Sequence, residues 1–147
     1  MLKSENLEII EAKEFLTDRS LQKVLAASVY NPTQARMDER VKRYSDSKFA
    51  VFAAIYDQKI CGVIIIEISR NNRLTILDFA VSEPLRGQGI GTALIRHLQL
   101  EYTPSEICAQ TDDDAVGFYR KLGFVIEKEP ELYTDTVRYH CTYFCGL

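Results

Sequence analysis

Residues 81–92 read VSEPLRGQGIGT, and they join a predicted strand to a predicted helix through glycines at positions 87, 89 and 91. Glycine accepts a positive φ and lets backbone N–H groups approach an anion, because it carries no Cβ. The helix behind the glycines adds unpaired N–H groups and the positive end of its dipole. Arg86 adds a fixed positive charge beside them. The stretch is therefore typical of a site that holds phosphate.

Two common phosphate-binding templates do not fit this stretch. A Walker A loop requires a Gly-Lys pair, and the sequence contains none. The Rossmann pattern G-x-G-x-x-G, begun at Gly87, requires a glycine at position 92, where the sequence has Thr92. On the loop alone, a glycine-rich turn that only ends a strand and starts a helix remains an alternative.

The spacing of apolar residues predicts the element order β-α-α-β-β-β-α-β-α-β-β. Strands are expected at residues 7–10, 49–56, 60–68, 74–81, 105–110, 124–128 and 137–144. Helices are expected at about residues 20–29, 33–44 and 89–101, and a fourth from a capping box at Thr111-x-x-Asp114 to a glycine terminator at Gly123. The order indicates an α/β (α+β) fold in which helices cover a mixed sheet.

Length and composition indicate a single domain over residues 1–147, with a net charge of −3 and no run of Lys or Arg. Nucleic-acid binding needs a basic surface, so we expect no nucleic-acid partner. The N-terminus is polar, and the longest apolar stretch, residues 62–66, is too short to cross a bilayer. We therefore expect a cytoplasmic protein without a membrane partner.

The four cysteines lack the spacing of a metal site, and His97 and His140 are the only histidines, so no metal is expected. Cys141 and Cys145, placed on one strand, would lie ~13 Å apart at ~3.3 Å per residue, which is too far for a disulfide. Reduced thiols in a reducing compartment are the expectation.

A second informative segment comes after the loop, where Tyr119 lies one turn before Leu122-Gly123-Phe124. Arg86-x-x-Gly89-x-Gly91 matches the [Arg/Gln]-x-x-Gly-x-[Gly/Ala] motif of the GNAT superfamily of N-acetyltransferases. Residues 114–124 resemble the later segment of that family, and residues 77–81 resemble its fourth strand. The resemblance covers nearly the whole chain. It implies the GNAT fold, a mixed sheet of six to seven strands flanked by about four helices.

The resemblance implies acetyl-CoA as cosubstrate and direct transfer of its acetyl group to a primary amine. The pantetheine arm would pair with the fourth strand, and the pyrophosphate would lie on the glycine loop. Where many family members carry asparagine this chain has Asp112, which can accept from helix N–H groups but cannot donate, so a helix cap is favoured there. The implied cofactor-binding residues are Phe79, Ala80, Val81, Arg86, Gly87, Gln88, Gly89, Ile90, Gly91, Thr92, Asp112 and Tyr119.

The resemblance also implies catalytic roles. The backbone N–H of Val81 would face the thioester carbonyl as an oxyanion donor, and Tyr119 would act as general acid toward the coenzyme A thiolate. A core aromatic on an amphipathic helix is the alternative for Tyr119. Asp78, the one ionisable residue inside the predicted central strand, is a candidate general base, and Glu67 is a second choice. A structural hydrogen bond or ion pair, with the proton relayed through water, is equally open.

In the family the acceptor pocket is built by the first two helices and by the connection between the last two strands, here roughly residues 30–37 and 129–136. The second segment is acidic and would tolerate a cationic amine, and the identity of the acceptor stays open. A rival interpretation is a non-catalytic acyl-CoA sensor or scaffold, which would keep the loop and dispense with Tyr119. The aromatic last strand, with Tyr139, Tyr143 and Phe144, could contribute to a homodimer edge.

Overall fold

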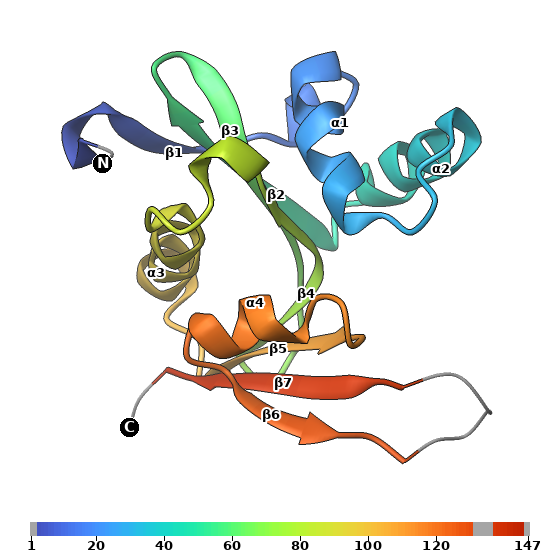
Figure 1. Cartoon of the computed structure of the whole chain (residues 1–147), viewed down its shortest axis with the longest axis vertical. Helices are drawn as coiled ribbons and strands as arrows, with labels where there is room; N and C mark the ends of the chain where they lie inside the picture. The colour runs from blue at the N-terminus through green and yellow to red at the C-terminus, as the bar shows by residue number, and fades with distance from the viewer. Residues whose placement is uncertain (1–2, 131–136, 146–147) are drawn as a thin grey trace.

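The computed structural model describes residues 3–130 and 137–145, and within them seven strands form one mixed sheet (Figure 1). The spatial order of the strands is β1-β2-β3-β4-β5-β7-β6. Every neighbouring pair is antiparallel except β4 and β5, which run parallel. The expected mixed sheet is confirmed, with strands β1 (Leu7–Glu11), β2 (Phe49–Tyr56), β3 (Lys59–Ile68), β4 (Arg73–Val81), β5 (Glu106–Thr111), β6 (Val125–Lys128) and β7 (Tyr139–Phe144).

The helices occur in the order that the apolar spacing predicts. The expected helix over residues 20–29 is too long, because α1 ends at Leu25 and the chain tightens into a 3₁₀ turn before Val29 becomes extended. The described chain contains α1 (Arg19–Leu25), α2 (Gln34–Tyr44), α3 (Ile90–Tyr102) and α4 (Val116–Lys121), with 3₁₀ turns η1 (Ser4–Asn6), η2 (Lys13–Phe15), η3 (Ala26–Ser28) and η4 (Glu83–Leu85).

The strand β3 is buried on both faces, which explains its nearly continuous apolar sequence. Ile64 and Ile66 point into a core shared with α3 and α4, whereas Val63 and Ile65 point into a second core shared with α1 and α2. The two helix pairs lie on opposite sides of the central strands (Figure 1). Burying one such aliphatic side chain contributes about 1.5–3 kcal/mol, so both layers hold the central strands in place.

The sheet opens between its two parallel strands. β4 pairs with β5 only over residues 73–76, and the next residue, Leu77, is the extra residue of a bulge in the pairing with β3. β4 then continues to Val81 and β5 to Thr111 without pairing to each other, and the two strands diverge (Figure 1). Within the described part of the chain, residues 77–81 therefore have no strand beside one of their backbone edges.

The capping box expected at Thr111-x-x-Asp114 is wrong. Thr111 is still part of β5, where it pairs with Tyr139 of β7 and is buried, so its backbone stays extended. The carboxylate of Asp112 instead accepts from the backbone N–H groups of Asp114 at 3.0 Å and Ala115 at 3.1 Å. The α-helix itself begins at Val116. At its other end the expected glycine terminator is confirmed, because Gly123 has a φ of +98°.

The strand β7 does not lie at an edge of the sheet. It pairs with β5 on one side and β6 on the other. The expectation that this aromatic strand contributes to a dimer edge is therefore wrong. Tyr139 and Tyr143 pack partly on the core, and Phe144 is 65 % exposed. The sheet ends instead at β1 and β6.

The four cysteines are free thiols, three of them buried and Cys145 half-buried. Burial raises the pKa of each thiol above its ordinary value. No group of three possible metal ligands gathers among residues 3–130 and 137–145. Of the helices described there, none has the length and apolar character to cross a membrane.

Gly62 of β3 lies directly under α3, where an added Cβ would stand 2.9 Å from Ile90 Cγ2 and 3.2 Å from Leu94 Cδ1. We expect Gly62→Ala to lower the free energy of unfolding by about 1–3 kcal/mol, because the helix must shift or its side chains must leave their rotamers. Gly117→Ala in α4 is the control, since nothing lies within 4 Å of its added Cβ. Urea unfolding compares the variants, and a wild-type midpoint for Gly62→Ala would contradict the close packing.

Candidate active site

The glycine loop connects the end of β4 to the start of α3. Gly87 has a φ of +78° and Gly89 a φ of +91°, a region in which a side chain is strained, and Gly89 is the N-cap of the helix. The first intrahelical bond is donated by Ala93 to Gly89 O at 2.9 Å. The N–H groups of residues 90–92 precede that bond and have no partner inside the helix. Together they form the open, positive end of α3.

The exposure of the loop residues matches an anion-binding role. Arg86, Gly87, Gln88, Gly89 and Thr92 are exposed, and nothing lies within 4 Å of a Cβ built on Gly87 or Gly89. Ile90 and Gly91 are buried, and they attach the start of the helix to the rest of the molecule.

Gly91 allows α3 to approach α4 closely. A Cβ at this position would lie 3.3 Å from Leu122 Cδ2 and 3.6 Å from Phe118 Cζ. The two helices therefore meet over one face of the sheet, where both pack on the same core. This contact brings the loop and the Tyr119 segment, which are distant in sequence, into one region.

The backbone of β4 presents polar groups to that opening. Ser82 donates its N–H to Cys61 O on β3 at 2.8 Å. Along an antiparallel strand, successive residues direct their N–H and C=O groups alternately toward and away from the partner strand. The N–H and C=O groups of Phe79 and Val81 consequently point away from β3. Arg86 uses this orientation, since its Nε donates to Val81 O at 3.0 Å. Ala80 lies between them with its side chain in the core of α1 and α2.

Tyr119 lies on α4 with its side chain turned to the core, and it is only 7 % exposed. Its ring makes edge-on contacts with Phe79, Phe118 and Phe124 at centroid distances of 6.2, 5.4 and 5.2 Å. Its hydroxyl forms no hydrogen bond with any residue that the structure describes. Burial raises the pKa of Tyr119, and nearby Cys141 and Asp78 raise it further. The phenol therefore keeps its proton at neutral pH, with a donor available for a ligand.

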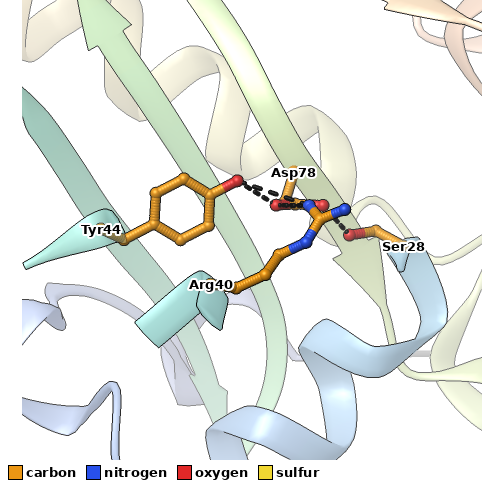
Figure 2. Close-up of polar contacts among 4 residues, drawn as sticks. All are labelled: Ser28, Arg40, Tyr44 and Asp78. Carbon is orange, nitrogen blue, oxygen red and sulfur yellow. Dashed lines mark hydrogen bonds and ion pairs between the residues drawn. The ribbon is translucent and has the colours of Figure 1, made fainter. Parts of the chain in front are cut away.

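Asp78 lies in the bulge of β4, is 3 % exposed, and takes part in a four-residue network (Figure 2). Its Oδ1 accepts from Ser28 Oγ at 2.6 Å, and its Oδ2 accepts from Arg40 Nη1 at 2.5 Å and from the Tyr44 hydroxyl. Burial lowers the pKa of Arg40, but the Asp78 carboxylate more than restores it. Burial, with Asp78, raises the pKa of Tyr44. These contacts favour a structural ion pair over a general base at Asp78.

The sequence does not identify Arg40 and Tyr44 as site residues. Their spacing on α2 is i, i+4, and the apolar pattern places Tyr44 on the buried face, but no local signal relates either of them to position 78. Glu67, the second candidate base, is half-buried in β3 opposite Thr75, and its side chain bonds to no described residue. Among the described residues, the structure brings no further carboxylate to Asp78.

The two expected acceptor segments are described unequally. In the first, Tyr30 is 84 % exposed, and Arg36 lies 5.9 Å from its ring centroid and donates Nη1 to its carbonyl at 3.3 Å. Of the second, Glu129 and Pro130 are described and residues 131–136 lie outside the described residues. Glu129 Oε1 accepts from Gln110 Nε2 at 3.1 Å, which links this segment to β5.

A groove of about 450 Å³ opens on the side of β4, β5 and β7 that faces away from α3 and α4. It runs along the paired part of β4 and β5 and reaches the point where their pairing ends. Its lining includes Thr75, Leu77, Cys108, Gln110, Arg138 and His140.

Comparison with known proteins identifies the family. A family model described as an acetyltransferase (GNAT) domain matches residues 13–141. No curated protein sequence matches the chain.

Three solved structures resemble this fold over nearly its whole length. An aminoglycoside 6'-N-acetyltransferase complexed with coenzyme A has a TM-score of 0.74 at 16 % identity and covers 95 % of this chain and 98 % of its own. A spermidine N-acetyltransferase chimera from Vibrio cholerae has a TM-score of 0.70 at 18 % identity, covering 95 % and 96 %. The ribosomal-protein-S18-alanine N-acetyltransferase from Escherichia coli has a TM-score of 0.67 at 17 % identity, covering 92 % and 90 %.

Asp112 is expected to stabilise the start of α4 as a cap. Asp112→Ala should lower the free energy of unfolding by about 0.5–2 kcal/mol, because two backbone N–H groups lose their acceptor. Asp112→Asn should have little effect, since the amide oxygen accepts the same bonds. Asp114→Ala is the matched control, because Asp114 is exposed and its side chain bonds to no described residue. Equal losses in thermal unfolding for positions 112 and 114 would contradict the cap.

Proposed function

Because the chain belongs to the GNAT acetyltransferase family, we propose that it transfers an acetyl group from acetyl-CoA to a primary amine by direct attack. The observation that carries the proposal is the opening between β4 and β5. It combines the free backbone edge of Phe79 and Val81, the positive start of α3 and the hydroxyl of Tyr119, whose ring packs against Phe79. Each of these groups suits a different part of an acyl-CoA molecule.

The cofactor would bind along this opening. Its pyrophosphate would accept from the N–H groups at the start of α3 and interact with Arg86, since helix N-termini bind anions. Its pantetheine amides would pair with the free edge of residues 79–81, which lack a neighbouring strand within the described chain. Asp112 lies at the end of β5 beside this path and serves mainly to cap α4.

The Val81 N–H would polarise the thioester carbonyl. Its orientation away from β3 and toward the opening supports this role. As negative charge develops on the carbonyl oxygen during attack, a fixed N–H donor lowers the barrier by about 2.7–4 kcal/mol. The contribution comes from the main chain, so the Val81 side chain only packs in the core.

Tyr119 would act on the leaving group. The tetrahedral intermediate collapses to the amide, and coenzyme A leaves as a thiolate. The pKa of the corresponding thiol is about 8.5 by analogy with cysteine. A phenol whose pKa is raised by burial holds its proton and donates a hydrogen bond to that sulfur. The free hydroxyl of Tyr119 supports this role over that of a core aromatic alone.

The incoming amine must lose a proton, and Asp78 is poorly suited to take it. Its two oxygens already accept from Ser28, Arg40 and Tyr44. We propose that the proton leaves through water in the groove beside β5. This groove is open to solvent, and its volume of about 450 Å³ is large enough for several water molecules. The amine would reach the thioester from this groove, whose lining extends along β4 to Leu77. The exposed segment 30–36 would form the acceptor wall.

The acceptor is proposed only as a primary amine. The structural relatives act, by their names, on an aminoglycoside, on spermidine and on an alanine of ribosomal protein S18. A non-catalytic acyl-CoA sensor is the second candidate, and the retained Tyr119 hydroxyl, which no contact within the described chain uses, argues against it.

Coenzyme A is expected to raise the melting temperature, whereas ATP and NAD are not. At a ligand concentration of 100 Kd the stabilisation is about 2.7 kcal/mol. Thiol release from acetyl-CoA with a panel of polyamines, aminoglycosides, amino acids and peptides then identifies the acceptor. Stabilisation by ATP or NAD alone would overturn the family activity, and binding of acetyl-CoA without release for any amine would favour the sensor.

Tyr119→Phe is expected to lower kcat about 100-fold with little change in the KM for acetyl-CoA, because the leaving thiolate loses its donor. The deficit should persist across the neutral and mildly alkaline range, since burial raises the pKa of Tyr119 and the phenol does not titrate there. Tyr102→Phe is the control, because this half-buried tyrosine of α3 packs on Phe52 outside the site. An unchanged rate where chemistry limits turnover would remove Tyr119 from this role.

A further inference from the structure

The Asp78 network joins three segments that are distant in sequence. Ser28 closes η3, Arg40 and Tyr44 lie one turn apart on α2, and Asp78 belongs to β4 (Figure 2). A buried carboxylate is costly unless charge and hydrogen bonds compensate it, so the three donors and the acid depend on one another. The side chain of Arg40 is 30 % exposed, whereas that of Asp78 is 2 % exposed. The network therefore reaches from the surface of α2 to the interior of the sheet.

Tyr44 and Arg40 have contacts beyond Asp78 that help to hold them in place. Tyr44 is fully buried, and its ring meets Phe49 edge-on at a centroid distance of 5.3 Å. Arg40 Nη1 also lies 3.5 Å from the Tyr44 hydroxyl. Ser28 comes shortly after the buried end of α1. The position of the Asp78 carboxylate is thus determined from two elements at once.

Asp78 occupies the position at which the course of β4 changes. The bulge lies between the pairs Ile65–Asp78 and Ile66–Ile76, and pairing with β5 ends at the same place. A bulge bends and twists its strand, so the placement of its residues sets the direction of the rest of that strand. Val81, the proposed oxyanion donor, lies three residues after Asp78 on the same strand. Its N–H is aimed by the course that β4 takes from the bulge.

Two residues of the network, Ser28 and Arg40, lie on either side of the proposed acceptor wall, residues 30–36, in the sequence. Residues 30–36 are exposed, and the chain enters them just after Ser28 and leaves them just before Met37, with Arg40 one turn further on. Ser28, before this segment, and Arg40, after it, are therefore both bonded to one carboxylate. That carboxylate belongs to the strand that supplies the N–H groups of the reaction.

We propose that Arg40 and Tyr44 are positioning residues for acetyl transfer, which hold Asp78 and thereby aim the Val81 N–H and join it to the acceptor wall. The inference rests on the proposed function, because it assigns these residues to the same reaction. Displacement of reacting groups by about 1 Å can cost about 100-fold in rate, so a modest change in the bend of β4 is measurable.

The carbonyl stretch of bound acetyl-CoA reports on the Val81 N–H, because a hydrogen bond to the carbonyl oxygen lowers its frequency. Infrared difference spectra are recorded with acetyl-CoA isotope-labelled at the acetyl carbonyl. For the wild type we expect a band below that of free acetyl-CoA. For Arg40→Met and Tyr44→Phe we expect the band to move back toward the free value, while the Kd for coenzyme A stays nearly unchanged.

The rate is measured with hydroxylamine, a small nucleophile that needs no acceptor pocket. We expect Arg40→Met and Tyr44→Phe to slow the catalysed transfer about 10- to 100-fold. Arg40→Lys keeps the charge and should restore part of both signals. Lys42→Met is the matched control on the same helix, since Lys42 is exposed and its side chain bonds to no described residue. If Arg40→Met does not fold, Tyr44→Phe alone tests the positioning role, because it keeps both the Arg40–Asp78 ion pair and the ring packing.

The outcomes separate the two proposals. A wild-type band and rate in folded Arg40→Met and Tyr44→Phe, with only the melting temperature lowered, would overturn the positioning role and leave the proposed function standing. A wild type that does not bind acetyl-CoA would overturn the proposed function, and the positioning role with it.

Discussion

The interrupted pairing between β4 and β5 is the constraint on which the rest of the structure depends. Backbone N–H and C=O groups inside a protein need hydrogen-bond partners, and beyond Ile76 the only strand that pairs with β4 within the described chain is β3. In the proposed function, the other edge of residues 77–81 pairs with the amide groups of the cofactor. The helices α3 and α4, the glycine loop and Tyr119 all lie around this edge and acquire their proposed roles from it.

The surroundings of the opening are closely packed. Gly62 lets α3 lie close to β3, and Gly91 lets it lie close to α4, so the positive end of the helix is held from two sides. On the other face the Asp78 network bonds η3 and α2 to β4 next to its bulge. A site whose N–H groups are already in place before the cofactor arrives loses little conformational entropy when it binds.

Much of this arrangement could be predicted from the sequence, because its signals are local. The order of strands and helices results from apolar spacing, and the glycines at positions 87, 89 and 123 correspond to positive φ angles. Features that depend on distant residues could not be predicted. Thr111 looks like a helix cap in isolation, but pairing with β7 keeps it in a strand. Arg40 and Asp78 are 38 residues apart, so no local pattern relates them. The bulge next to Asp78 appears only in the register of β3 and β4.

The exposed position of segment 30–36 bears on how the amine specificity of an enzyme with this fold can evolve. Its residues contribute little to either core, whereas the side chains that anchor it, Ser28 and Arg40, lie outside it. Substitutions within the segment can therefore accumulate without loosening β4, the strand proposed to activate the thioester. Mutation can explore new amines here at small risk to the fold, so the evolution of specificity is separated from the maintenance of chemistry.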